Sequence, residues 1–341
     1  MGGANSVYIS PFYSPFYKND TWRSTDLGAT WMQINASSGW SARYGHTSVA
    51  MPDGSIVLMG GQIGTTYKND VWRSTDNGAT WKQVNASAGW SARHGHTSVA
   101  IPDGSIVLMG GYDGGYKNDV WRSINSGATW TRVNASAGWS ARSYHTSVAM
   151  SDGSIVLMGG GAGPTYKNDT WRSTDNGATW TRVNASAGWT ARYMHTSVVM
   201  PDSSIVLMGG YSSGYKNDTW QSTDNGASWT QVNAGAVWSG RDRHSSVAMP
   251  DSSIVLIGGW VGNLNFRDVW RFVSTGSSVQ NSSHTYTAAG NYSVALQAYN
   301  ARRVQQHAED WIYYRNGIII GTGRKFQRQH HLRRLTTHRP V

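Results

Sequence analysis

One sequence unit occurs five times, and this repetition constrains the fold more than any other feature. The unit opens with R-x-x-H, continues with I-V-L-M-G-G and Y-K-N-D-V-W, and closes with a turn and two further tryptophans; it runs without interruption from Arg43 to Trp90. The period alternates between 50 and 49 residues, as the spacing of the anchoring histidines shows: His46, His96, His145, His195 and His244. A period of this length predicts a propeller or a solenoid.

Each unit predicts four short antiparallel strands. His46 to Met51 and Ser55 to Met59 are apolar or β-branched runs joined by Pro52-Asp53-Gly54, where Pro fixes φ and Gly can take φ > 0. Asp70 to Arg73 and Thr80 to Val84 form a second pair, joined by S-T-D-N-G-A. Because no segment has an apolar period of 3.6 residues, we predict an all-β chain. Four-stranded sheets repeated around an axis form a β-propeller.

Two family resemblances support this fold. The order R-x-x-H, I-V-L-M-G-G, Y-K-N-D-V-W and a further Trp resembles the kelch repeat, from Met1 to about Phe272. The turn S-T-D-N-G-A-T-W, at Ser74 and Ser173, resembles the Asp-box of sialidase-like propellers, also called the BNR repeat. Both patterns mark how a blade is built, so neither identifies a function. The recurrent tryptophans, such as Trp72, Trp81 and Trp90, are predicted to pack between sheets.

The number of blades follows from counting strands by type. The chain holds six third strands but only five of each other type. We therefore predict a kelch-type propeller of six blades over residues 1–272, with the first and last blades incomplete. A five-bladed closure, in which the amino-terminal strand completes the last blade, is the alternative.

The composition changes after Phe272. Residues 273–301 contain a polar linker and H-T-Y-T-A-A-G-N-Y-S-V-A-L-Q-A-Y-N, which resembles the closing strands of a PKD domain, a module common in archaeal and bacterial surface proteins. Residues 302–341 form a basic tail with nine Arg or Lys residues and two acidic residues, Glu309 and Asp310. A one-base insertion near Ala301 would explain this change, because suitable codons read in another frame restore a PKD-like sequence. We expect a tail that is disordered or frameshifted; a genuine basic tail is the alternative.

Charge and composition exclude several classes of function. The net charge is +10, but outside the tail twenty basic and seventeen acidic residues leave only +3. We therefore expect no specific nucleic-acid binding by the propeller; binding of anionic polymers by the tail is a separate hypothesis. The sequence contains no run of eighteen apolar residues, so it predicts no membrane-spanning segment. The absence of Cys excludes thiol chemistry, and with it the Cys-Tyr copper site of the galactose-oxidase branch of kelch proteins.

Catalysis finds little support in the sequence. Sialidases pair a Tyr nucleophile with Glu, yet the only glutamate is Glu309. The recurrent Asp residues are explained by turn hydrogen bonds, and no asymmetric set of base, nucleophile and orienting group remains. The R-x-x-H histidines are spread around a ring, so we predict hydrogen bonds to neighbouring blades and no metal site. We predict a non-enzymatic protein without catalytic residues, metal or cofactor; a sialidase-like or other glycan-active propeller is the alternative.

The blades differ at two places, and function is predicted there. These are the two central residues of R-x-x-H and the residue after the Gly pair, which the kelch resemblance places at one mouth of the channel. We predict that this mouth binds a protein or a glycan, in an exported, extracellular or cell-surface module for binding or adhesion; neutral drift among repeats is the alternative. N-A-S and N-D-T sequons support export weakly. The candidate ligand-binding residues are Tyr44, His94, Tyr112, Tyr144, Met194, Tyr211, Arg243 and Trp260.

Overall fold

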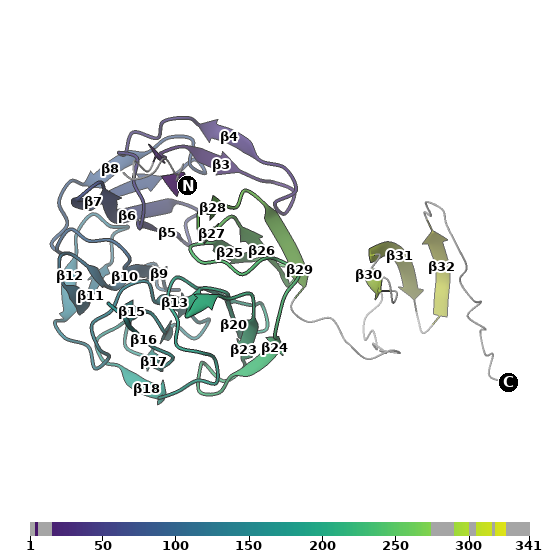
Figure 1. Cartoon of the computed structure of the whole chain (residues 1–341). Helices are drawn as coiled ribbons and strands as arrows, with labels where there is room; N and C mark the ends of the chain where they lie inside the picture. Colours follow the sequence, from purple (N-terminus) through teal and green to yellow (C-terminus); the bar gives the residue numbers. More distant parts are fainter. Residues whose placement is uncertain (1–3, 6–15, 274–289, 300–304, 316–317, 325–341) are drawn as a thin grey trace. The chain divides into compact units, whose positions relative to one another are not determined.

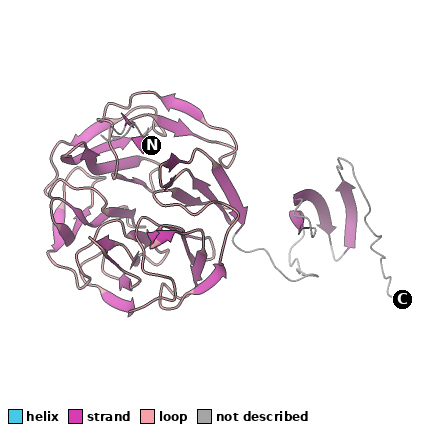
Figure 2. Cartoon of the chain, in the orientation of Figure 1, coloured by secondary structure: helices cyan, strands magenta, loops and turns pink. Residues whose placement is uncertain are grey.

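The computed structural model describes residues 4–5, 16–273, 290–299, 305–315 and 318–324. The chain divides into two units, Met1–Gly276 and Ser277–Val341, and each is considered by itself. All regular secondary structure elements in the described residues are β-strands (Figure 2). The prediction of an all-β propeller is confirmed for the first unit, whose sheets surround a central channel (Figure 1).

Five sheets of this unit contain an innermost strand, and in each the strands run antiparallel in sequence order from the channel outward. The first four blades have four strands and the fifth has three. Their bounds are β5 (Thr47–Ala50), β6 (Ile56–Ile63), β7 (Thr66–Ser74) and β8 (Lys82–Asn85); β9 (Thr97–Ala100), β10 (Ile106–Tyr112), β11 (Tyr116–Ser123) and β12 (Thr131–Asn134); β13 (Thr146–Ala149), β14 (Ile155–Met158), β17 (Thr170–Ser173) and β18 (Thr181–Asn184); β19 (Thr196–Val199), β20 (Ile205–Met208), β23 (Thr219–Ser222) and β24 (Thr230–Asn233); and β25 (Ser245–Ala248), β26 (Ser253–Ile257) and β29 (Val269–Val273).

Short hairpins follow the Gly pairs on one face of the propeller. In the first two blades these hairpins continue the second and third strands through a bulge at the Gly pair. Elsewhere they are separate two-stranded sheets. Their bounds are β1 (Ala4–Asn5) with β2 (Phe16–Tyr17), β15 (Gly161–Ala162) with β16 (Thr165–Tyr166), β21 (Tyr211–Ser212) with β22 (Gly214–Tyr215), and β27 (Trp260–Val261) with β28 (Leu264–Asn265).

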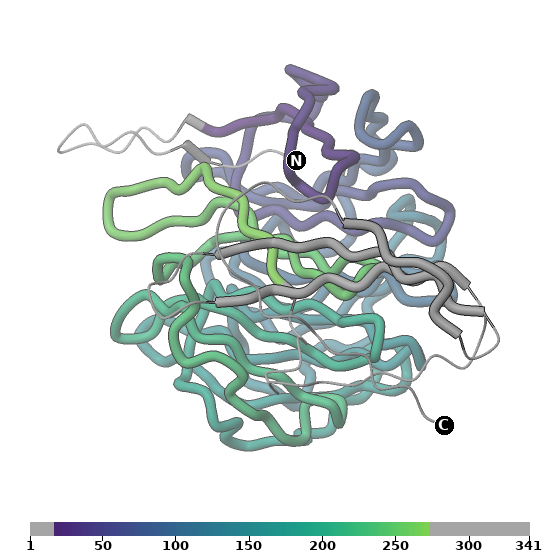
Figure 3. The backbone as a smooth tube through the Cα atoms, turned by 90° about the vertical axis from the view of Figure 1, so that its right-hand side faces the viewer, coloured from purple at the N-terminus to yellow at the C-terminus, as the bar shows by residue number. Residues whose placement is uncertain are grey.

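A further two-stranded sheet, β3 (Thr21–Arg23) and β4 (Met32–Asn35), lies between the fifth and first blades. Its turn packs on the fifth blade, because a Cβ built on Gly28 would lie 3.0 Å from Cγ1 of Val255. On its other side, a Cβ built on Gly78 of the first blade would lie 2.6 Å from Cγ2 of Thr21. The purple β3–β4 sheet therefore lies between the green fifth blade and the first blade (Figures 1 and 3).

The prediction of six blades is corrected to five, since five sheets reach the channel. The number agrees with the alternative prediction, but the closure does not, because β3 pairs with β4 and, among the described residues, not with β29. The reason is that β3 and β29 are the same type of strand. Each needs a second strand on its inner side and a fourth strand on its outer side, so one cannot complete the other.

The hydrophobic core lies between neighbouring blades. The I-V-L-M strands are buried on both faces; Val107, Leu108 and Met109 have 0% exposure. Trp90 is also buried and packs edge-to-face on Trp130 of the next blade, with ring centroids 6.0 Å apart. The same pairing recurs at the next two junctions. The predicted packing of tryptophans between sheets is confirmed, and edge-to-face contacts of this kind add to the area that they bury.

Each R-x-x-H arginine is buried in an ion pair with the aspartate that lies in, or directly before, the third strand of its blade. Arg142 binds both carboxylate oxygens of Asp169, at 2.6 and 2.9 Å, and donates to the carbonyl of Gly159. The prediction that turn hydrogen bonds explain the recurrent aspartates is wrong for this set, because a buried guanidinium requires a counter-charge. It holds for the turn aspartates, since Asp76 accepts from the Ser74 hydroxyl and the Thr80 amide.

The second unit contains one antiparallel sheet of three strands, β30 (Gly290–Tyr299), β31 (Gln305–Arg315) and β32 (Ile318–Arg324). Strands β31 and β32 fall within residues 302–341, for which the sequence predicts disorder or an altered reading frame. Their sequences W-I-Y-Y and I-I-I are rich in aromatic and β-branched residues, which favour strands. Residues 274–289 and 325–341 lie outside the described residues. The PKD resemblance and the frameshift stay predictions.

Candidate functional site at one mouth of the channel

The two variable positions of each blade lie side by side. A backbone bridge joins the residue after the R-x-x-H arginine to the residue after the Gly pair in the same blade, as His94 and Tyr112 illustrate. Equivalent bridges pair Tyr193 with Tyr211 and Asp242 with Trp260. The sequence variation of the blades is therefore gathered on one face, at one end of the channel.

The residue before each R-x-x-H histidine belongs to an open series of hydrogen bonds along this opening, and we call these five residues the mouth ring. Gly95 N donates to Gly45 O, Tyr144 N to Gly95 O, Met194 N to Tyr144 O, and Arg243 N to Met194 O, at 2.7 to 3.0 Å. All five residues have positive φ, between 52° and 64°. Two are Gly, which adopts this conformation freely, and three are not.

The three side chains of the mouth ring are held there at a conformational cost. A non-Gly residue at positive φ costs about 1–3 kcal/mol and persists only where the surrounding structure enforces it. Tyr144, Met194 and Arg243 each bear this cost at the positions where the first two blades have Gly. The left-handed backbone points these side chains toward the channel, where all three line the same cavity.

That cavity has a volume of about 660 Å³ and occupies the channel beneath the mouth. Its wall consists of threonine and serine residues of the innermost strands together with the R-x-x-H histidines. Five of the eight predicted site residues line it: Tyr44, Tyr144, Met194, Arg243 and Trp260. A cavity of this volume can hold a side chain or a short segment of a ligand.

Of the other three predicted residues, His94 and Tyr211 belong to a belt of aromatic rings around the mouth, and Tyr112 packs against this belt. Neighbouring centroids in this aromatic belt are 5.0 to 6.3 Å apart. The belt runs through Tyr17, Tyr44, His94, Tyr144, Tyr193, Tyr211, Tyr215 and Trp260, and Tyr67, Tyr112, Tyr116 and Tyr166 pack against it. The structure thus brings all eight predicted residues together.

The fifth blade places charge in this aromatic surface. The guanidinium of Arg243 lies over the indole of Trp260, 5.0 Å from the ring centroid. The neighbouring Asp242 is 1% exposed, and its Oδ1 has no hydrogen-bond partner among the described residues. Burial raises the pKa of Asp242 to about 6, and the positive charge of Arg243 opposes this rise. Burial also raises the pKa of Tyr193 to about 12, assisted by Tyr166.

Basic residues adjoin the belt tyrosines in the sequence. One lysine directly follows the belt-side tyrosine of each Y-K-N-D segment, at positions 18, 68, 117, 167 and 216, and Arg267 takes this place in the fifth blade. Among the described residues, one of these lysines has an ion pair, Lys117 with Asp113 at 2.9 Å. The segments that carry these tyrosines therefore also carry a basic residue in each repeat.

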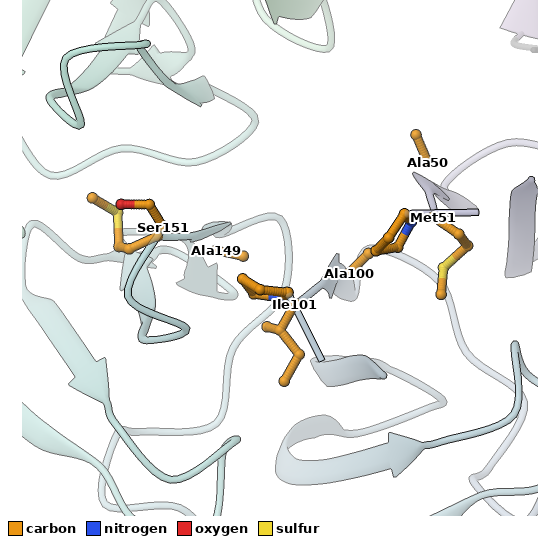
Figure 4. A pocket seen from close by; sticks show the side chains of 9 residues that line it. Ala50, Met51, Ala100, Ile101, Ala149 and Ser151 are labelled. Carbon is orange, nitrogen blue, oxygen red and sulfur yellow. The ribbon is translucent and has the colours of Figure 1, made fainter. Parts of the chain in front are cut away.

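The opposite end of the channel has a different chemistry. A second cavity, of about 340 Å³, is formed there by the ends of the innermost strands and their turns. Figure 4 shows its lining by Ala50, Met51, Ala100, Ile101, Ala149 and Ser151, from three successive blades. These positions hardly vary between the repeats, in contrast to those of the mouth.

Sequence reasoning missed part of the mouth. The tyrosines of Y-K-N-D, such as Tyr67 and Tyr166, recur in the blades and therefore resemble architectural residues. Tyr193 and Asp242 stand at variable positions but are not among the predicted site residues. The one available signal is that Asp242 is the only acid inside any R-x-x-H motif.

The sequons are occupied by structural hydrogen bonds. Nδ2 of Asn134 donates to the carbonyl of Ala178 in the next blade at 2.7 Å, while its Oδ1 accepts from the Ser136 amide. Asn168 of an N-D-T sequon likewise donates from Nδ2 to the Trp189 carbonyl. N-glycosylation would attach a glycan to Nδ2. In the folded blade this atom already donates a hydrogen bond to a backbone carbonyl.

The R-x-x-H histidines serve the contacts between blades. Nε2 of His145 lies 2.9 Å from the Thr97 hydroxyl of the preceding blade, so the predicted hydrogen bond between blades is confirmed. The described residues contain no group of three or more His, Asp or Glu side chains that could hold a metal ion. Over the same part of the chain, no helix is long and apolar enough to cross a membrane.

Comparison with known families agrees with this architecture. Residues 14–160 match the KLHDC2/KLHL20/DRC7 Kelch-repeats domain, and residues 118–248 match the family described as sortilin, neurotensin receptor 3. No curated protein matched the chain. The kelch match over residues 14–160 agrees with the antiparallel sheets of the propeller.

Proposed function

We propose that the protein is a non-enzymatic binding module that holds a segment of a partner protein across the mouth of the channel. The observation that carries this proposal is the aromatic belt, which surrounds a cavity of about 660 Å³ and contains one cation, Arg243. Aromatic residues and Arg are the side chains that dominate binding energy at protein interfaces. Arg243 at the mouth, together with the basic residue that follows each belt-side aromatic residue in the chain, favours an acidic partner segment.

A protein ligand fits this surface better than a glycan. Tyr144, Tyr193 and Tyr211 contact their neighbours edge-to-face, so part of each ring face is already covered. Stacking on a sugar needs free ring faces, whereas a peptide can use ring edges, hydroxyl groups and the guanidinium. Kelch-repeat propellers are usually binding modules, and Asp242 is the single acid among the varying R-x-x-H positions.

We further propose that the module acts outside the cell, at a cell surface, in adhesion or recognition. The PKD-like sequence of residues 284–300 and the Asp-box-like turns support this location. Secretion of a tagged protein by its native cell, followed by detection on intact cells, would test it. Retention of the tagged protein in the cytoplasm would contradict it.

Selection of displayed random peptides on the purified protein tests the binding proposal. We expect enriched peptides rich in Asp or Glu, whose affinity falls about tenfold or more in Arg243→Ala and Trp260→Ala. Arg132→Ala is a matched control, because Arg132 also lies over a tryptophan, Trp121, at 5.8 Å, but on the outer strand β12. That variant should bind normally.

Two results would overturn the proposal. Selective binding on a carbohydrate array, abolished by Trp260→Ala, would replace the protein ligand with a glycan. Release of sugar from a sialoside by the purified protein would identify an enzyme.

A further inference from the structure

The junction between the fifth and first blades is incomplete, unlike the other four junctions. A cluster of buried apolar residues fills each junction from the first blade to the fifth. Among the described residues no such cluster joins the fifth blade to the first. Only the outer β3–β4 sheet lies there, and the place corresponding to an innermost hairpin has no described strand.

Exposure of equivalent residues shows that this place is open. Val247 on β25 is 46% exposed, whereas its counterparts are 6–8% exposed: Val49, Val99, Val148 and Val198. Across the gap, Ile56 of the first blade is partly exposed, while the isoleucines at the same position of the other blades are fully buried. Both flanks therefore present apolar surface that every other blade covers.

The strand at the back of the gap also lacks its inner neighbour. In the first blade Trp72 lies opposite Leu58 of the second strand, and this pairing recurs in the other blades. Trp22 of β3 holds the same position, but its described partner strand is β4 alone, and Trp22 is 43% exposed. The inner edge of β3 is thus open to a further strand.

An unpaired carboxylate marks the same place. Asp20 is the counterpart of Asp70, Asp119, Asp169, Asp218 and Asp268, each of which binds a buried R-x-x-H arginine. Among the described residues Asp20 accepts hydrogen bonds from Trp22 Nε1 at 2.8 Å and Gln33 Nε2 at 3.4 Å, and it has no ion pair. At the gap, Asp20 therefore lacks, within the described part of the chain, the arginine that pairs with the equivalent aspartate in every other blade.

We propose that this gap, which we call the blade slot, binds a β-hairpin of a partner protein that has the repeat's own pattern, R-x-x-H followed by two apolar strands. Its second strand would pair antiparallel with β3 and place a leucine opposite Trp22. Its arginine would bind Asp20, and its first strand would cover Val247. Apolar surface, an open strand edge and charge complementarity select the same occupant. The proposal does not depend on the function of the mouth.

A peptide copied from the second blade tests the blade slot directly. The probe is a labelled peptide of residues 93–109, R-H-G-H-T-S-V-A-I-P-D-G-S-I-V-L-M, titrated with the full chain and followed by fluorescence anisotropy. We expect saturable binding, weakened about tenfold or more when the peptide carries Arg93→Asp. Binding of that peptide should be restored by Asp20→Arg in the protein, because the charge pair is then reversed.

A pair of valine variants locates the binding. Val247→Asp should reduce peptide affinity about tenfold or more, because it buries a charge at the contact. Val232→Asp is the matched control: Val232 is 45% exposed on the outer strand β24, and this variant should bind as the native chain does. Circular dichroism of both variants establishes that they are folded.

Three results would overturn the proposal. The first is that the folded native chain does not bind the peptide, or that the Val247→Asp and Val232→Asp variants bind it with equal affinity. A chain that is dimeric at micromolar concentration, and becomes monomeric with Val247→Asp, would show that a second copy fills the slot. Binding that appears only after residues 277–341 are removed would show that the chain's own second unit fills it.

Discussion

The hydroxyl of Thr97 lies 2.9 Å from Nε2 of His145, across the boundary between the second and third blades. The same contact joins Thr47 to His96, Thr146 to His195 and Thr196 to His244. Each histidine is buried against the channel wall and beside the R-x-x-H arginine of its own blade. One polar contact per junction therefore links the blades in register, next to the apolar cores.

These histidines make the propeller sensitive to mild acid. Burial, assisted by the charge of Arg142, lowers the pKa of His145 to about 3, and the other R-x-x-H histidines shift in the same direction. The unfolded chain protonates them near pH 6.5, so between pH 6.5 and about 3 it binds more protons than the native state. Stability should therefore fall as the pH falls, by about 1.4 kcal/mol per pH unit for each histidine.

Urea unfolding at pH 7, 6 and 5 measures this effect. His145→Gln should have a shallower pH dependence than the native chain, by the contribution of one proton. Equal free energies of unfolding at pH 7 and pH 5 would contradict the prediction. The paired aspartates do not interfere, because the pKa of each lies below its usual range in the native state.

The buried pair Arg142–Asp169 should be essential for stability. Burial alone would raise the pKa of Asp169, but hydrogen bonds and the charge from Arg142 lower it overall. Asp169→Ala leaves a guanidinium with 0% exposure unpaired, which should cost about 3–5 kcal/mol. Arg172→Ala breaks an exposed pair with Asp152 in the same blade and should cost about 0–1 kcal/mol. Similar losses in the two variants, measured by urea unfolding, would refute the distinction.

The first glycine of the Gly pair in each of the first four blades should not tolerate a side chain. A Cβ built on Gly110, whose φ is 61°, would lie 2.8 Å from Cε1 of His145 and 3.0 Å from the Arg142 carbonyl. Gly104→Ala is the control, because Gly104 has φ of 82° but a Cβ built on it would meet no atom within 4 Å. We expect about 1–2 kcal/mol of backbone strain in the control and a clearly larger loss in Gly110→Ala. Thermal unfolding of both variants compares them; equal midpoints would disprove a steric role.

Asp242→Asn should stabilise the protein at neutral pH. Burial raises the pKa of Asp242 to about 6, so at pH 7.5 the native state contains a charged, buried carboxylate whose Oδ1 is unpaired among the described residues. Removing that charge should add about 2–3 kcal/mol. The gain should shrink as the pH falls from 6 toward 4, because native Asp242 then binds a proton that the unfolded chain does not yet bind. Urea unfolding at pH 7.5 and 4.5 checks both parts, and a less stable variant at pH 7.5 would contradict them.

The sequence was informative wherever the five units agree. The I-V-L-M-G-G strands, the turn after Ser74 and the packing of Trp90 between blades follow from residue types that recur at fixed spacing. The link between His145 and a neighbouring blade is predictable for the same reason. A feature repeated in every unit is determined by local chain geometry and by one kind of blade contact, so it can be read without coordinates.

The partners of charged residues were harder to predict. The sequence favours a turn for Asp169, although its partner Arg142 lies 27 residues earlier in the chain. The isolated acid of Asp242 is visible in the sequence, but its burial is not. Which charges meet depends on how one strand type lies against another, and that geometry appears only when the sheets have formed.

The fold class, the strand types of each blade and the face on which the blades differ can all be read from the sequence, because they depend on periodic hydrophobicity and turn chemistry. The closure of the ring and the exposure of its surfaces cannot, because they depend on contacts between blades. Val247 and Val99 occupy the same position of the same motif, yet one is exposed and the other buried. Whether a residue at this position is buried depends on the blade that packs against it. The sequence of a single repeat does not show which blade that is.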